Sequence, residues 1–114
     1  GAGVSFAIIY EMYKFLSYLG YSFVLLDVYT ITGEYKENGF IELNIPNLAS
    51  INHIKKYDAL NIGRKPIAVH TVGNRKFKVE ADVFILELET SLRKLRQLVM
   101  DSAIDLQNEA FRRK

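Results

Sequence analysis

Four acidic side chains are the residues best placed to do chemistry, because small nucleases hold Mg²⁺ between two or three converging carboxylates. Glu87 and Glu89 form a closely spaced pair at an expected strand end. Asp82 is an odd number of residues from Glu87, so the two side chains point to opposite faces of one strand. Restriction enzymes have a lysine two residues after the second acid of their metal site. In this chain Glu89 stands two residues after Glu87, where that lysine would be. A divalent-metal nuclease is therefore kept only as a second alternative function, with four candidate ligands: Glu11, Asp82, Glu87 and Glu89.

The same carboxylates also have a structural explanation that needs no metal. We expect Asp82 to pair with Lys65, and Glu87 and Glu89 to mark a strand end and the acid-favouring first turn of a helix. Asp27 is the one charge within an apolar strand. A buried carboxylate is costly without a partner, so we expect a specific donor from Lys14, a tyrosine hydroxyl or the sheet edge.

Basic side chains gather around two glycine-containing turns, and a basic β-hairpin is one way to contact a phosphate backbone. The first alternative function is therefore nucleic-acid binding by the hairpin of residues 64–78, through five side chains: Arg64, Lys65, Arg75, Lys76 and Lys78. The whole chain has 15 basic and 13 acidic residues, a net charge of +2. That charge is too small to indicate a nucleic-acid or membrane partner by itself.

Several classes of site are excluded or disfavoured by composition. The chain has no cysteine, which excludes disulfides, thiol nucleophiles and cysteine-based metal centres. It has two histidines, and no serine lies in a nucleophile elbow. His70, which we expect opposite Phe77, is interpreted as a hydrogen-bonded core or interface histidine. We lean towards a function without catalysis and expect no cofactor.

The length of 114 residues fits one domain spanning 1–114. Residues 1–3 are interpreted as a cloning remnant and residues 112–114 as a basic tail. The apolar run from Val4 to Leu26 contains Glu11 and Lys14, and each charge in a membrane span would cost roughly 2.5–3.5 kcal/mol. We therefore expect a core helix rather than a membrane span, and a cytoplasmic protein.

Hydrophobic period places the elements of the first half. A broad apolar face at helical spacing predicts a helix: Phe6, Ile9, Met12, Phe15, Leu16 and Leu19. From Tyr21 the period becomes two with both faces apolar, which predicts a central strand covered on both sides. Asn38-Gly39 predicts a type I′ hairpin turn. A spacing of three from Leu48 to Tyr57 predicts a short helix that stops at residues 61–63.

The second half predicts a hairpin around Gly73-Asn74, a type II′ turn, and then a long helix. The turn sets three expected cross-strand pairs: His70 with Phe77, Ala68 with Val79, and Lys65 with Asp82. The helix is expected to be capped by Thr90 or Ser91 and to reach about Phe111. The order α-β-β-α-β-β-α predicts an α+β domain with an antiparallel sheet of about four strands, helices packed on the sheet and a long C-terminal helix.

The chain carries more apolar surface than these elements obviously cover. The last helix has one apolar stripe, formed by Leu92, Leu95, Val99, Ala103, Leu106 and Ala110. A second, smaller cluster, formed by Met100, Ile104 and Phe111, lies roughly 100° around that helix from the stripe. We expect a non-enzymatic interaction or assembly module that forms a homodimer, or docks on another protein, through five residues: Met100, Ile104, Phe111, Phe15 and Leu19.

Overall fold

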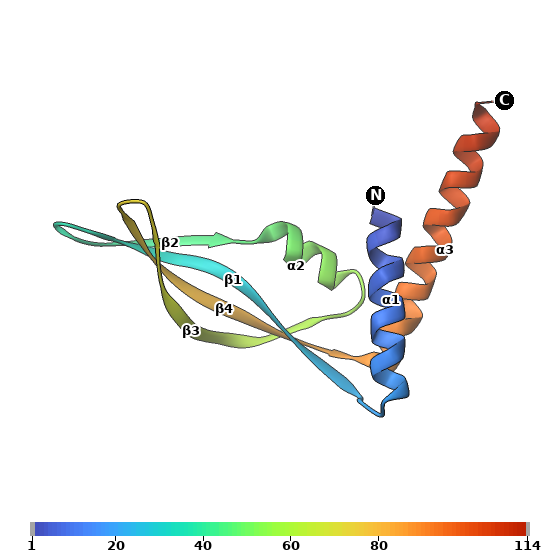
Figure 1. Ribbon diagram of the computed structural model, residues 1–114, viewed down its shortest axis with the longest axis horizontal. Coiled ribbons are helices and arrows are strands. Elements are labelled where there is room, and N and C mark those ends of the chain that lie inside the picture. Colours follow the sequence, from blue (N-terminus) through green and yellow to red (C-terminus); the bar gives the residue numbers. More distant parts are fainter. Residues whose placement is uncertain (1, 114) are drawn as a thin grey trace. The chain divides into compact units, whose positions relative to one another are not determined.

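The computed structural model describes residues 2–113 of the chain (Figure 1). It has an α+β fold with three helices and a four-stranded antiparallel sheet, as predicted, and the strand order in the sheet is β2-β1-β4-β3. The elements are α1 Ala2–Tyr18, β1 Phe23–Lys36, β2 Gly39–Pro46, α2 Leu48–Lys55, β3 Leu60–Val72, β4 Arg75–Glu87 and α3 Leu88–Arg112. The strand predicted to be central, β1, lies beside β4 in the middle of the sheet.

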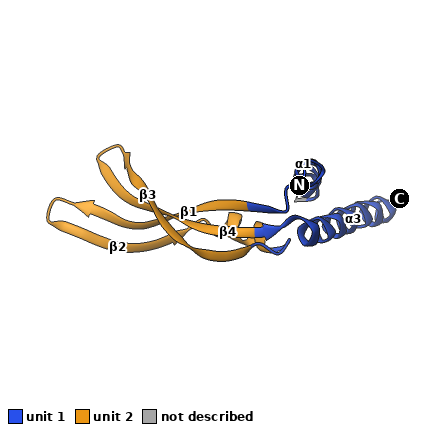
Figure 2. Cartoon of the chain, turned by 90° about the horizontal axis from the view of Figure 1, so that it is seen from below, with its two compact units in different colours: residues 1–24, 56–59, 86–114 blue, residues 25–55, 60–85 orange. Residues whose placement is uncertain are grey.

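The chain divides into two compact units (Figure 2). Unit 1 contains α1 and α3 together with residues 56–59. Unit 2 contains α2 and most of the sheet, residues 25–55 and 60–85. The two units are described separately below.

Unit 1 is built on α1 and α3, which lie side by side and run antiparallel (Figure 1). At one end, a Cβ added to Gly3 would lie 2.7 Å from Cβ of Ser102. At the other end, the Leu88 amide donates to the Ser22 carbonyl at 2.9 Å. The helices approach closely at Gly3 because glycine has no side chain to hold them apart.

Aromatic rings fill the core of unit 1. Tyr13 of α1 meets Tyr57 edge to face, with ring centroids 6.1 Å apart, and both residues are buried. Burial raises the pKa of both phenols. The Ser91 hydroxyl donates to the Tyr57 carbonyl at 2.6 Å, which ties α3 to residues 56–59. The predicted cap at Thr90 or Ser91 is therefore wrong: α3 begins at Leu88, and Ser91 is used in the core.

Helix α2 is shorter than predicted, because the apolar spacing that predicted it continues to Tyr57. This helix ends at Lys55, and Asp58 follows with a φ of 69°. Aspartate tolerates the left-handed conformation better than most residues, so it supports the turn. Asn61 to Gly63, predicted as the helix stop, instead belong to β3.

The first hairpin of unit 2 forms, but its turn is shifted by one residue. Lys36 pairs with Gly39, so Glu37 and Asn38 occupy the turn. A type I′ turn over Asn38-Gly39 needs positive φ at both residues, whereas Asp58 is the one non-glycine residue with positive φ within 2–113. The predicted turn type is therefore wrong, although the hairpin itself is confirmed.

The second hairpin follows the predicted register near its turn and departs from it further away. His70 faces Phe77 and Ala68 faces Val79, and Gly73 has a φ of 61° as a type II′ turn requires. A bulge between Pro66 and Ala68 then inserts one residue into β3. Beyond that bulge, Lys65 faces Ala81 and Arg64 faces Asp82, so the predicted Lys65–Asp82 pair is wrong.

One face of β1 is open in this chain, where both were expected to be covered. Val28 and Thr30 are buried on one side. Phe23, Leu25 and Tyr29 alternate with them and are each more than half exposed. His70 on β3 is also exposed, so its predicted core position is wrong, while its role at an interface stays a prediction.

Candidate functional site

The predicted nucleic-acid surface is largely neutralised by carboxylates. Of its five basic side chains, all within the described part of the chain, only Lys76 shows no ion pair. The ion pairs join Arg64 to Asp82 and Glu80, Lys65 to Asp27, Arg75 to Glu34, and Lys78 to Glu80. Counterion release on nucleic-acid binding depends on cations that are free to meet phosphates. The structure therefore brings the hairpin cations to carboxylates of the same sheet.

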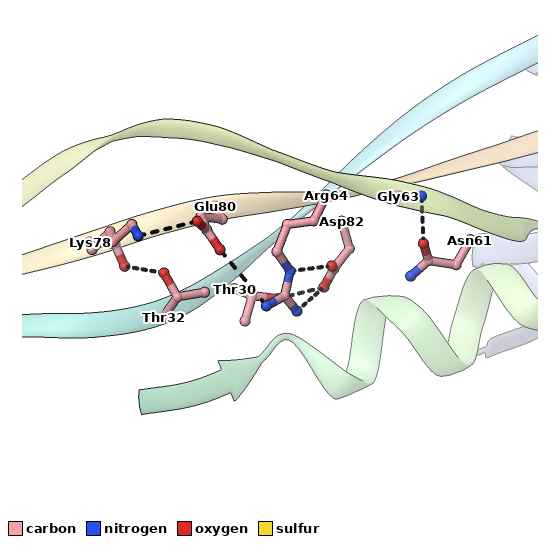
Figure 3. A network of polar contacts seen from close by, with 8 residues as sticks. All are labelled: Thr30, Thr32, Asn61, Gly63, Arg64, Lys78, Glu80 and Asp82. Atoms are coloured by element: carbon pink, nitrogen blue, oxygen red, sulfur yellow. Dashed lines mark hydrogen bonds and ion pairs between the residues drawn. The ribbon is translucent and has the colours of Figure 1, made fainter. Parts of the chain in front are cut away.

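Asp82 is the centre of the polar network in Figure 3. The Arg64 guanidinium donates to it through Nε at 2.8 Å and Nη2 at 3.3 Å, and the buried Thr30 hydroxyl donates at 2.7 Å. The Arg64 guanidinium holds the pKa of Asp82 below its usual range, against the opposing effect of burial, and Thr30 adds to the lowering. Asp82 is thus a charged group with three donors rather than a free ligand.

Glu34 is the second buried carboxylate of unit 2. Arg75 donates to both its carboxylate oxygens, through Nε at 2.8 Å and Nη2 at 2.9 Å, and Lys36 Nζ lies at 3.2 Å. The guanidinium is the main cause that lowers the pKa of Glu34 to about 2. The same guanidinium lies 4.9 Å from the Phe77 ring centroid. Arg75 is therefore held on the sheet by both its charge and its flat face.

Asp27 has its partner on β3, a strand at the edge of the sheet, which was one of the expected sources of a donor. Lys65 Nζ lies 2.9 Å from its carboxylate, reaching across β4 at the level of the fully buried Ala81. Lys14, one of the expected donors, instead pairs with Glu11 at 3.4 Å. Asp27 keeps about a third of its side chain exposed. The ion pair explains the charge within an apolar strand without a functional role.

The four candidate metal ligands do not form a metal site. Asp82 is bound to Arg64 and Glu11 to Lys14, as above. Glu87 accepts a hydrogen bond from Thr90 at 3.1 Å, and Glu89 lies 4.0 Å from Arg93. Within residues 2–113, no group of three or more acidic or histidine side chains is arranged to hold a metal ion.

Helix α1 carries two apolar faces. The face that packs in unit 1 includes Phe6 and Tyr13, both buried. The opposite face carries five exposed apolar side chains, here named the outer stripe of α1: Val4, Ile8, Met12, Phe15 and, in the turn directly after the helix, Leu19. Their spacing of four, four, three and four residues places them on one side of a helix with 3.6 residues per turn. A helix that is apolar all round is normally buried on all sides.

Helix α3 shows the same arrangement. Its packed side is centred on the buried residues Leu88, Ser91 and Leu95. At about 100° per residue, the second cluster lies on the opposite side of α3 rather than beside the packed stripe. This outer cluster of α3 consists of Met100, Ile104 and Phe111, which are 48%, 51% and 77% exposed. Ala103, Leu106 and Ala110 of the predicted main stripe are also exposed, because α3 continues beyond the start of α1 (Figure 1).

The five predicted interface residues are all exposed, but they lie in two places. Phe15 and Leu19 are near the C-terminal end of α1, and they are 59% and 54% exposed. The outer cluster of α3 lies near the other end of this antiparallel helix pair, because Ser102 is beside Gly3. The predicted interface also missed Val4, Ile8 and Met12, although their four-residue spacing was a legible signal.

The described chain has no helix that is both long and apolar enough to cross a membrane. Comparisons with protein-family models, with curated proteins and with solved structures found no match.

Proposed function

We propose that this chain is a non-enzymatic assembly module that forms a homodimer through apolar helix faces. One observation carries the proposal: α1 and α3 bury one apolar face against each other, and each presents a second apolar face on the side away from its partner. Large contiguous apolar patches are rare on monomeric proteins and mark sites of association.

The energetics support association by these faces. Full burial of a leucine, isoleucine, phenylalanine or methionine side chain contributes about 1.5–3 kcal/mol. The side chains of the outer stripe and the outer cluster are about half exposed or more, so each has about 1 kcal/mol left to gain. Neither surface contains a charged residue whose burial would oppose that gain.

The first test is the molar mass in solution, measured by light scattering at moderate and at high salt. An apolar contact is not screened, so we expect a dimer under both conditions. A monomer at micromolar concentration in both salts would refute the proposal.

Two substituted proteins locate the contact. One carries Phe15→Ser and Leu19→Ser, and the other carries Met100→Gln, Ile104→Gln and Phe111→Gln. We expect each loss of a buried side chain to weaken the dimer by about fivefold, from about 1 kcal/mol. The matched control is Val69→Gln with Val72→Gln, which removes exposed apolar side chains of β3. Equal weakening by the control would contradict the assignment to the helices.

The sequence also suggested two alternative functions, nucleic-acid binding and a metal-dependent nuclease. The ion pairs and acidic residues described above do not support either one. A heterologous protein partner and the cytoplasmic location stay predictions.

A further inference from the structure

The outer stripe of α1 has a symmetric spacing. Val4 and Leu19 are equally far from a point between Glu11 and Met12, and so are Ile8 and Phe15. Reading the helix backwards about this point therefore reproduces these four apolar positions, while Met12 exchanges with Glu11 beside the point itself. A twofold interface uses one patch on both copies, so a contact between one residue and a second residue of the other copy occurs twice: the second residue of its own copy makes the same contact in return. The stripe has the pattern that such an interface requires from two antiparallel helices.

We propose that a second copy of this chain docks through α1, antiparallel to the first, with the twofold axis passing between Glu11 and Met12. Val4 then packs against Leu19 of the other copy, and Ile8 against Phe15 of the other copy. Met12 lies next to its own counterpart near the axis. This inference rests on the proposed homodimer and specifies which face forms it and in which orientation.

The charges beside the stripe favour the antiparallel orientation. Glu11 and Lys14 lie on the same flank of α1, they pair at 3.4 Å, and both side chains are more than half exposed. In an antiparallel pair the same flanks of the two helices face each other, so Glu11 of each copy comes beside Lys14 of the other. In a parallel pair this flank would instead face Ser5 and Leu16, which carry no charge. Complementary charges at the rim of an interface fix orientation more than affinity.

The helix dipoles act in the same direction. Antiparallel helices place the positive N-terminal end of one beside the negative C-terminal end of the other. Packing of this kind brings helix axes to about 8–10 Å, close enough for the outer stripes to interdigitate. The outer cluster of α3 lacks the symmetric spacing, since Ile104 is four residues from Met100 and seven from Phe111.

Disulfide trapping tests the orientation directly, because the chain has no cysteine of its own. The variants are Val4→Cys, Leu19→Cys, Met12→Cys and, as a control outside the stripe, Tyr18→Cys. All four positions are exposed in the single chain, so the substitutions leave its packing intact. Each variant, and an equimolar mixture of Val4→Cys with Leu19→Cys, is mildly oxidised and analysed on a non-reducing gel.

We expect Met12→Cys to cross-link to itself, and the mixture to yield at least about tenfold more dimer than Val4→Cys or Tyr18→Cys alone, because a disulfide needs Cβ atoms about 3.5–4.5 Å apart. Light scattering of the same reduced proteins separates the two proposals. A dimer in which Val4→Cys alone cross-links, or in which no α1 pair does, overturns the antiparallel α1 contact and leaves the homodimer standing. A monomer overturns both.

Discussion

The replacement Gly33→Ala provides a sharp test of packing in the sheet. A Cβ added to Gly33 would lie 1.9 Å from Cζ, 2.4 Å from Cε2 and 2.9 Å from Cε1 of Phe40. The Phe40 ring therefore covers this glycine, and it also contacts Tyr35 at a centroid distance of 5.0 Å. The backbone of Gly33 is outside the left-handed region, so alanine fits the chain itself and only the ring stands in its way.

The ring must leave its place by more than 1 Å, since carbon atoms pack at about 3.5–4.0 Å. Loss of the Tyr35 contact costs about 0.5–1.5 kcal/mol. Phe40 is already 44% exposed, so exposing the remainder costs on the order of 1 kcal/mol more. Alanine itself stabilises the folded state by about 0.5–1 kcal/mol relative to glycine, because glycine loses more conformational freedom on folding. We expect Gly33→Ala to destabilise the fold by about 0.5–2 kcal/mol, and each kcal/mol lowers Tm by roughly 4–8 °C in a small domain.

The sign reverses when the ring is absent. In a Phe40→Ala background, we expect Gly33→Ala to be neutral or to stabilise the fold by about 0.5–1 kcal/mol. Urea unfolding of the four proteins in this cycle, at one protein concentration because association affects stability, measures the coupling. If Gly33→Ala has the same effect in both backgrounds, the ring does not occupy the space beside Gly33 and the reasoning fails.

Two further predictions concern the buried carboxylates of unit 2. The pKa of Glu34 is about 2, below its ordinary value of 4.5, so its contribution to stability is complete above pH 4.5 and is lost as the pH falls towards 2. We expect the urea midpoint of the wild type to fall over this range more steeply than that of Glu34→Gln; parallel curves would contradict the assignment. Asp82→Asn keeps the side-chain shape but removes the charge that accepts from Arg64 and Thr30. We expect it to cost about 1–3 kcal/mol in urea unfolding at pH 7, and a loss below about 0.5 kcal/mol would show that the network is not stabilising.

The order of the elements was predictable because it depends on local pattern. The change from a helical period to a period of two near Tyr21, and the glycine at Gly73, each mark a boundary through a few neighbouring residues. The cross-strand pairs next to Gly73 were correct for the same reason, since the turn and its closest residues set them. The apolar excess on the first and last helices was also legible from spacing alone.

The wrong predictions share a different cause. Lys65 faces Ala81 rather than Asp82 because β3 bulges at Ile67, and nothing in the local sequence requires an extra residue there. Because of that single insertion, Arg64 forms the ion pair with Asp82, and Lys65 forms an ion pair with Asp27 instead. The type I′ turn at Asn38-Gly39 failed similarly, because pairing of the flanking strands outweighed the preference of the dipeptide.

The sequence by itself determined the order α-β-β-α-β-β-α, the two hairpins and the presence of apolar helix faces beyond those needed for one core. Hydrophobic period and turn residues act over a few positions, so each can be interpreted without the rest of the chain. Only the tertiary structure decided which carboxylate neutralises which cation, and that the face with Val4, Ile8, Phe15 and Leu19 stays exposed while the face with Phe6 and Tyr13 is buried. These outcomes depend on strand register and on helix rotation, which are fixed by packing between segments far apart in sequence.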